Sequence, residues 1–146
     1  MNSETHTTLA VVVDYSLSLT KMVADGRYDE VHRDITPRNF RLQATGFRQI
    51  ELNLVQFKRP VAPLEAVVLM KAEGFRPATI EELLALGSQY PEMQKSVPIG
   101  ALGSAHVVKN RRFVPCLSGS LSHRALTLAI IHRRWSTCYQ FAFVKN

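Results

Sequence analysis

The last third of this chain lacks acidic side chains altogether. Glu92 is the last carboxylate residue, and the 54 residues that follow it contain eight Lys or Arg and no Asp or Glu. The first 92 residues are nearly balanced, with ten basic and twelve acidic side chains. Because such a stretch cannot neutralise its own charge, its counter-charges come from the first part of the chain or from an anionic partner.

Cysteine and long apolar runs are also scarce. Two cysteines, Cys116 and Cys138, stand 22 positions apart. Because we expect a reducing compartment, we predict two buried thiols rather than a disulfide. The apolar run 9–13 is too short for the core of a signal peptide, and Glu4 stands where basic residues belong. No run approaches the roughly 20 apolar residues of a membrane helix. We therefore expect a cytoplasmic protein that does not associate with membranes.

The motifs that announce common chemistries are missing as well. The sequence has no phosphate-binding P-loop, no dinucleotide-binding glycine pattern, no zinc-protease motif and no serine nucleophile elbow. Cysteine and histidine do not recur at a spacing typical of zinc sites. No cofactor and no metal are expected.

The remaining composition is that of an ordinary globular protein. Hydrophobic residues make up 46% and charged residues 21% of the 146 positions, which predicts a folded core without disulfides. Helix patterns end at about residue 87 and a run of hairpin strand patterns follows, so we expect an α+β fold with an antiparallel sheet and two or three short helices. The length fits a single domain over 1–146, and it stays open whether 1–60 form a subdomain apart from 61–146.

Two strands are predicted in the first half. A β-branched run predicts a strand over 8–13, and alternating apolar residues predict another over 48–58. The apolar positions change parity at Leu54 and Val55, which indicates either a bulge or a strand that is covered on both faces.

Helical spacing predicts two helices around the second strand. The first covers 17–25, where Asp14 or Ser16 caps its start and Gly26 ends it. The second begins at Pro63 and ends near residue 73. We expect the buried face of this second helix to consist of Leu64, Val67, Val68 and Lys71.

A third helix is predicted between Gly74 and Gly87, in the most clearly punctuated stretch of the chain. Thr79 is a favourable N-cap residue and Glu82 follows three positions later, so the two predict a capping box. The stripe that we expect to be buried consists of Ile80, Leu83, Leu84 and Gly87.

The acid-free part is rich in strand patterns. We expect strands over 99–102, 105–108, 112–117, 124–132 and 139–144. Residues 109–111 form the loop of a predicted hairpin, and 118–120 predict a further turn. In the last strand Tyr139, Phe141 and Phe143 share one face.

The stretch Gly74-Phe75-Arg76-Pro77-Ala78-Thr79-Ile80-Glu81-Glu82-Leu83 resembles the helix-opening signature of C-type-lectin-like proteins. In bacterial members a Gly-aromatic-Arg segment and a Thr precede a helix with an acidic start. The resemblance covers about 65–146 and implies a helix followed by β-hairpins and a terminal strand. It does not extend to calcium-dependent sugar binding, because calcium needs about six to eight oxygen ligands and no carboxylate follows Glu92.

The chain also resembles a set of small bacterial proteins. They share four short patterns, here Arg76-Pro77-Ala78-Thr79, Tyr90-Pro91-Glu92, Ala101-Leu102-Gly103-Ser104 and Val114-Pro115-Cys116-Leu117. This second resemblance implies no function.

The strongest functional indication is a set of basic residues in the predicted loops of the last third. The set comprises Lys109, Arg111, Arg112, Arg124, His132, Arg133, Arg134 and Trp135. If the strands form one sheet, the loops meet at one of its ends. Our first hypothesis is a non-enzymatic binding module that presents these residues to a protein with an acidic surface, with Trp135 as apolar anchor. The alternative is a nucleic-acid-binding protein that uses the same cations on phosphates and Trp135 for stacking.

An enzyme is the third hypothesis, with two candidate centres. Cys116 with a histidine would form a thiolate–imidazole pair, and His32 lies between Asp29 and Asp34, where an acid–base or metal site would need it. The simpler interpretations, a buried thiol and a solvated polar turn, are favoured for both. The oligomeric state stays open.

Overall fold

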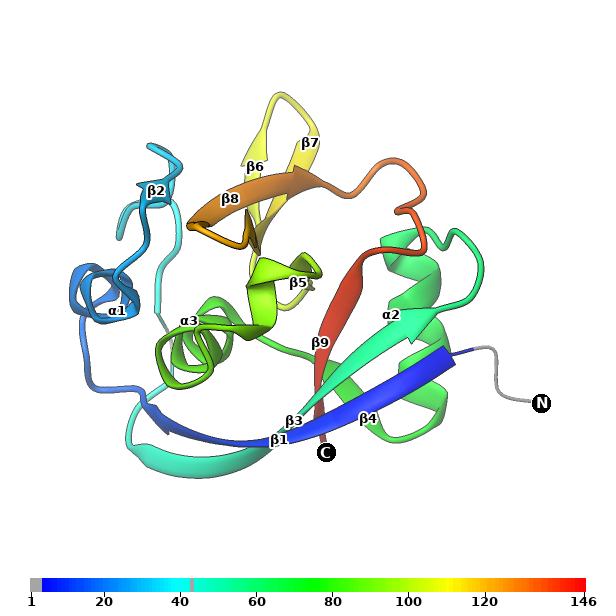
Figure 1. Cartoon of the computed structure of the whole chain (residues 1–146), viewed down its shortest axis with the longest axis horizontal. Coiled ribbons are helices and arrows are strands. Elements are labelled where there is room, and N and C mark those ends of the chain that lie inside the picture. The colour runs from blue at the N-terminus through cyan, green and yellow to red at the C-terminus, as the bar shows by residue number, and fades with distance from the viewer. Residues whose placement is uncertain (1–3, 43) are drawn as a thin grey trace.

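Figure 1 shows one mixed sheet that carries three α-helices, in a computed structural model that describes residues 4–42 and 44–146. The strands are β1 (Glu4–Asp14), β2 (Glu30–Val31), β3 (Phe47–Phe57), β4 (Phe75–Pro77), β5 (Ile99–Ala101), β6 (His106–Val108), β7 (Arg111–Ser120), β8 (His123–Ile130) and β9 (Gln140–Lys145). The helices are α1 (Leu19–Gly26), α2 (Pro63–Ala72) and α3 (Ile80–Gln89), with a 3-10 turn, η1 (Met93–Lys95). The predicted α+β class is confirmed.

The sheet joins strands from both ends of the chain. Its order is β1-β3-β9-β5-β7-β8-β2, with β4 added beside β9 and β6 beside β7. Most neighbours are antiparallel, but β5 runs parallel to β9 and β2 parallel to β8. The sheet is therefore mixed rather than purely antiparallel, and the strands of the first 60 residues are hydrogen-bonded into it at both edges, β1 and β3 through β9 and β2 through β8.

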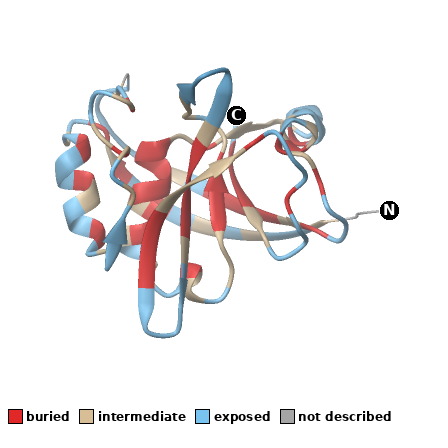
Figure 2. Cartoon of the chain, turned by 90° about the horizontal axis from the view of Figure 1, so that it is seen from above, coloured by how far each residue is buried: buried red, intermediate tan, exposed pale blue. Residues whose placement is uncertain are grey.

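Strand β3 is covered on both faces, which resolves the parity change that the sequence shows. Its pairing with β1 is continuous from Glu4 opposite Phe57 to Asp14 opposite Phe47, without a bulge. Leu52 and Leu54 belong to one hydrophobic cluster, whereas Val55 and Phe57 belong to a second. Buried residues consequently lie along the central strands, and exposed ones at the hairpin tips (Figure 2).

Helix α3 lies in the larger of the two clusters. The four residues of its predicted stripe are all buried. Glu82 at N3 accepts a hydrogen bond from the Thr79 backbone N–H at 2.9 Å, as expected for a capping box. This helix therefore fixes the packing of the sheet on one face, while α2 covers the other.

Helix α1 is capped by residues other than those expected. Ser18, not Asp14 or Ser16, is the N-cap, and its Oγ accepts from the Lys21 N–H at 3.1 Å. The left-handed residue after the helix is Arg27, at φ 51°, rather than Gly26. Gly26 is small for a different reason, because a Cβ there would overlap the ring of Tyr28.

Helix α2 buries a different side from the one predicted, and of the four predicted residues Val67 is the apolar one that packs partly buried against the second cluster. Its buried residues are Pro63, Ala66 and Met70, while Leu64 and Val68 are 66% and 68% exposed. Both sides of this helix are rich in apolar residues, so the spacing alone could not distinguish the core face. Gly74 follows the helix at φ 89°, which agrees with its predicted role as the terminating residue.

The hairpin of β6 and β7 is tighter than expected. Only Lys109 and Asn110 form its turn, with φ values of 49° and 65°, as a two-residue type I′ turn requires. The turn predicted at 118–120 is wrong, since these residues end β7 and are paired with β8. No helix among residues 4–42 and 44–146 is long and apolar enough to cross a membrane.

Candidate functional site

The two basic loops meet at one end of the sheet. Phe113 pairs with Ile130, so the residues next to this pair lie side by side. The Arg112 N–H donates to His132 Nε2 at 3.0 Å, and the Ile131 N–H donates to the Arg112 carbonyl at 3.2 Å. The exposed basic side chains of this region are called the basic loop surface, which consists of Lys109, Arg111, Arg112, His132, Arg133 and Arg134.

The cations of this surface have no carboxylate beside them. In the described part of the chain, none lies within 4.0 Å of Lys109, Arg111, Arg112, Arg133 or Arg134. Glu65 is a carboxylate whose pKa is influenced by the charge of this surface. It already pairs with Arg59, with 2.7 Å between Arg59 Nη2 and Glu65 Oε2. Arg59 lowers the pKa of the Glu65 carboxyl, and Arg134 adds to that effect. The acidic first half therefore leaves most of the surface unneutralised.

Arg124 does not belong to this surface. Its side chain is buried, and its guanidinium donates to the carbonyls of Gly26, Gly87 and Pro91 and to Gln94 Oε1. The carbonyls of Gly26 and Gly87 lie in the last turns of α1 and α3, where helix carbonyls carry partial negative charge. Arg124 is therefore a structural residue and is removed from the candidate site.

Trp135 is also internal. It is 5% exposed, its ring stacks on Phe141 at a centroid distance of 4.9 Å, and its Nε1 donates to the Ile130 carbonyl at 3.0 Å. Gly100 lacks the Cβ that would overlap the indole. Trp135 thus holds the loop before β9 against the sheet and is not available as an anchor or stacking residue.

An apolar groove runs beside the basic loop surface. It has a volume of about 350 Å³ and lies between α2 and β7. Its lining consists of Pro63, Leu64, Val67, Leu102, Ala105, Arg112, Val114 and Ile131. Arg112 belongs to both features, so cationic and apolar surfaces are continuous there. The sequence signal for this groove was the apolar stripe of 64–71, which had been assigned to the core.

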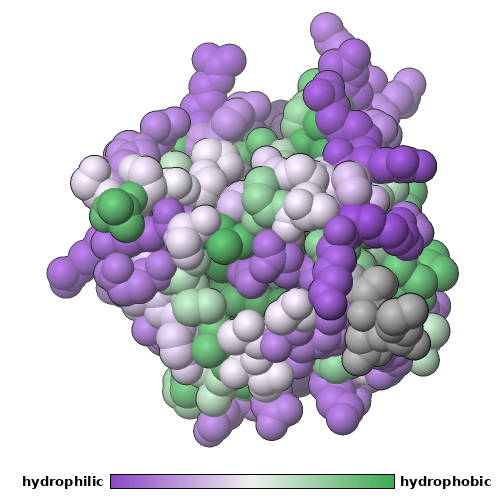
Figure 3. Space-filling view, turned by 45° about the vertical axis from the view of Figure 1, so that its right-hand side comes forward, coloured by the Kyte–Doolittle hydropathy of each residue, from purple (hydrophilic) through white to green (hydrophobic). Residues whose placement is uncertain are grey.

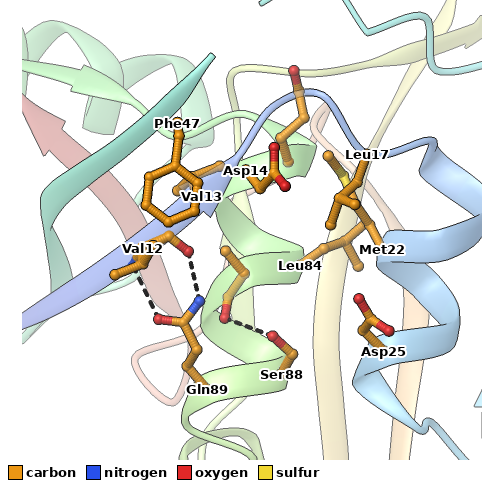
Figure 4. A pocket seen from close by; sticks show the side chains of 12 residues that line it. Val12, Val13, Asp14, Leu17, Met22, Asp25, Phe47, Leu84, Ser88 and Gln89 are labelled. Atoms are coloured by element: carbon orange, nitrogen blue, oxygen red, sulfur yellow. Dashed lines mark hydrogen bonds between the residues drawn. The ribbon is translucent and has the colours of Figure 1, made fainter. Parts of the chain in front are cut away.

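A smaller hollow of about 230 Å³ lies where β1, α1 and α3 meet (Figure 4). Two of its carboxylates serve local structure, since Asp14 accepts from the Ser16 N–H at 3.0 Å and Asp25 pairs with Lys21 at 2.7 Å. The Gln89 amide exchanges two hydrogen bonds with the Val12 backbone, at 2.9 and 2.6 Å. Gln89 thereby covers part of the free edge of β1, so Asp14, Asp25 and Gln89 serve the fold.

Neither proposed catalytic centre is arranged for chemistry. Burial raises the pKa of the Cys116 thiol to about 12, so it carries no thiolate at neutral pH. His32 Nδ1 accepts from the Asp34 N–H at 3.1 Å, and Asp29 accepts from the Arg124 N–H at 2.7 Å. Within the described residues, no three Cys, His, Asp or Glu side chains gather as a metal site.

A thiol reagent should distinguish the two cysteines. Both are free, but Cys116 is buried whereas Cys138 is exposed, contrary to the expectation that both are buried. We expect one thiol per chain to react in the folded protein and two in urea, because only the Cys138 thiol is accessible to the reagent before unfolding. A Cys138→Ser variant serves as control and should not react until it is unfolded. Rapid labelling of that variant would reopen the Cys116 hypothesis.

We compared the chain with models of protein families, with curated proteins and with solved structures, and no match was found. The resemblance to C-type-lectin-like proteins therefore stays a prediction, and the functional argument rests on the geometry of the basic loop surface and the apolar groove.

Proposed function

We propose that this chain is a non-enzymatic binding module that holds an acidic protein partner on the basic loop surface. The observation that carries the proposal is the cluster of arginines and a lysine on two adjoining loops without a carboxylate among them. Like charges so close repel one another, and an anionic partner relieves that repulsion. Such a surface also steers an acidic partner toward it and speeds association. We also expect the module to act in the cytoplasm.

A protein partner accounts for more of the surface than a nucleic acid does. Non-specific single-strand binding relies on aromatic side chains that stack on bases, and Trp135 is buried beneath the loop. An apolar groove adjoins the cations, and protein interfaces combine an apolar centre with a polar rim in which arginine is enriched. These two features favour the acidic protein over the phosphate backbone.

Charge reversal on the surface should abolish binding of an acidic probe. We expect a labelled peptide of Glu and Ser to bind the wild-type protein, and the affinity to fall as salt rises from about 50 to about 200 mM because exposed charges are screened. In the variant Arg111→Glu with Arg133→Glu, the affinity should fall at least about tenfold, or about 1.4 kcal/mol. Fluorescence anisotropy measures both effects.

The matched control is Arg27→Glu with Arg33→Glu, which changes the net charge equally at two exposed positions on other segments. We expect it to retain most of the affinity. An equal loss in both variants would mean that net charge alone attracts the peptide, and the proposal would fail. Tighter binding of duplex DNA than of the peptide would favour the nucleic-acid hypothesis instead.

A further inference from the structure

We infer that the apolar groove receives the apolar face of an acidic amphipathic helix of the partner, while the acidic face of that helix meets the basic loop surface. The inference rests on the proposed function and specifies which kind of protein segment the module holds. It assigns a role to the outward stripe of α2, which the fold itself does not use.

The outward stripe of α2 is apolar where a solvent-facing stripe is normally polar. Leu64, Val68 and Leu69 are 66%, 68% and 38% exposed on a helix of ten residues. Single exposed apolar residues need no explanation, but Leu64 and Val68 lie one turn apart on the same face, with Leu64 at the groove, and such a pair is typical of an interaction site. The space-filling view in Figure 3 shows hydrophobic areas interrupting an otherwise hydrophilic face of the molecule.

The groove is large enough for side chains but small for an independent ligand. Its volume of about 350 Å³ lies at the lower end of the roughly 300–1,000 Å³ of small-molecule pockets. Val114 and Ile131 are buried in the lining, while Leu64 stands exposed at the side that α2 contributes. A few apolar side chains from a partner would fill this space and cover the exposed stripe.

A helical partner matches the shape and length of this surface. Helix α2 has ten residues and is therefore about 15 Å long, which corresponds to two to three turns of a helix packed against it. Amphipathic helices bind grooves through apolar residues at positions i, i+3 or i+4, and i+7. When the apolar row of the partner helix packs against Leu64 and Val68, the opposite row of that helix faces solvent. The two rows on either side of its apolar row then lie next to the groove edges.

Charge complementarity decides the chemistry of the flanking rows. Arg112 lines both the groove and the basic loop surface, and no described carboxylate lies within 4.0 Å of it. Lys109, Arg111 and Arg133 line a separate hollow that shares no lining residue with the groove, so Arg112 is the cation that the groove itself presents. A flanking Glu or Asp residue on the partner helix would pair with Arg112, whereas Lys or Arg there would be repelled. The groove thus fits an acidic helix rather than a basic or uncharged one.

Two labelled probe peptides test the inference. In the first, Leu occupies positions at alternating spacings of three and four and Glu occupies the others; in the second, Ser replaces every Leu. We expect the Leu/Glu peptide to bind the wild-type protein at least about tenfold more tightly, because only it buries apolar surface in the groove. In the variant Leu64→Gln with Val68→Gln, this preference should disappear, while the Ser/Glu peptide keeps its affinity.

The control is Leu121→Gln, which removes a side chain that is 88% exposed in the turn between β7 and β8. It should leave both affinities unchanged, and urea unfolding should give the same midpoint for all three proteins because every replaced side chain is largely exposed. Equal binding of both peptides to the wild-type protein would overturn the groove assignment and leave the proposed function standing. If neither peptide binds, both fall. A lipid surface is tested by sedimentation with phosphatidylglycerol vesicles. If the wild-type protein sediments with the vesicles, the α2 variant does not, and the Leu/Glu peptide is not preferred, the stripe binds lipid and the inference is overturned.

Discussion

The variant Arg124→Ala should lose about 3–5 kcal/mol of unfolding free energy, because it leaves several inward-facing acceptors without a donor at a cost of about 1–3 kcal/mol each. The Arg124 Nε donates to the Pro91 carbonyl at 3.0 Å, and Nη2 donates to the Gly87 carbonyl at 2.7 Å and to Gln94 Oε1 at 3.0 Å. Nη1 donates to the Gly26 carbonyl. One side chain on β8 thereby joins the ends of α1 and α3 to the turn η1, and alanine would leave all four acceptors unpaired in the interior.

The buried ring of Tyr28 adds to this expected loss. The Arg124 guanidinium lies over it, 4.8 Å from the ring centroid, and burial raises the pKa of the Tyr28 hydroxyl to about 12. Removing the cation takes away a favourable contact with the aromatic face, worth roughly 2 kcal/mol where the pair is desolvated. Much of this cation–π contribution is already included in the expected loss of about 3–5 kcal/mol, because contributions within one network of contacts are not additive.

Urea unfolding measures the loss of unfolding free energy in Arg124→Ala, and two further variants serve for comparison. Arg124→Lys keeps the charge but cannot reproduce the planar set of donors, so we expect an intermediate loss. Arg133→Ala removes an exposed arginine and should change the unfolding free energy by no more than about 0.5 kcal/mol. If Arg124→Ala behaves like Arg133→Ala, the assignment of Arg124 to the core is wrong.

Elements with local signals were predicted well from the sequence. The capping box of α3, the strand over 48–58 and the hairpin around residue 109 depend on residues a few positions apart, and the structure contains all three. Their information is local, because a cap, an alternation and a turn are each defined within one short window. The convergence of the two basic loops followed from the correct assignment of the strands that carry them.

Predictions that depended on distant parts of the chain were less successful. Arg124 was assigned to the surface because arginine is rarely buried, yet its acceptors are mainly backbone carbonyls at distant positions, which no residue type reveals. Trp135 is covered by Phe141 of the following strand and by the close approach of Gly100. In both cases the decisive contact forms only when the sheet is assembled.

The groove was missed because an apolar stripe has two physical meanings. The spacing of Leu64, Val67 and Val68 is that of a core-facing helix, and the sequence contains no sign that Ala66 and Met70 would take that place. A helix that is apolar on both sides leaves one side uncovered when only the other side packs against the sheet. The groove and its basic edge are therefore features of the assembled fold rather than of any single motif.

The second large effect is expected at Glu82, where the resemblance to lectin-like proteins marked only a helix start. The carboxylate accepts two bonds from Arg76, at 2.9 and 2.7 Å, and one from the Tyr15 hydroxyl at 2.6 Å. It also accepts from the Thr79 N–H, and its side chain is 1% exposed. Glu82→Gln removes the counter-charge of Arg76, so we expect a loss of about 3 kcal/mol at neutral pH.

The loss should depend on pH in a defined direction. Burial acts to raise the pKa of Glu82, but the hydrogen bonds from Arg76, Tyr15 and Thr79 outweigh it and hold the pKa below its ordinary value of 4.5. The folded protein therefore binds fewer protons than the unfolded chain as the pH falls below about 5, and its stability decreases there. Glu82→Gln lacks this proton uptake, so the difference in unfolding free energy between wild type and variant should narrow from about pH 5 downward.

The chain contains its own control for burial. Glu65 pairs with Arg59 in the same two-bond geometry, at 2.7 and 3.4 Å, but its side chain is 41% exposed. Glu65→Gln should destabilise the protein much less than Glu82→Gln, since water screens an exposed pair and solvates the remaining arginine. Urea unfolding of both variants at a series of pH values compares the pairs directly. A cost at Glu82 no larger than at Glu65 would contradict the buried network, because desolvation of Arg76 and Tyr15 is what distinguishes the two sites.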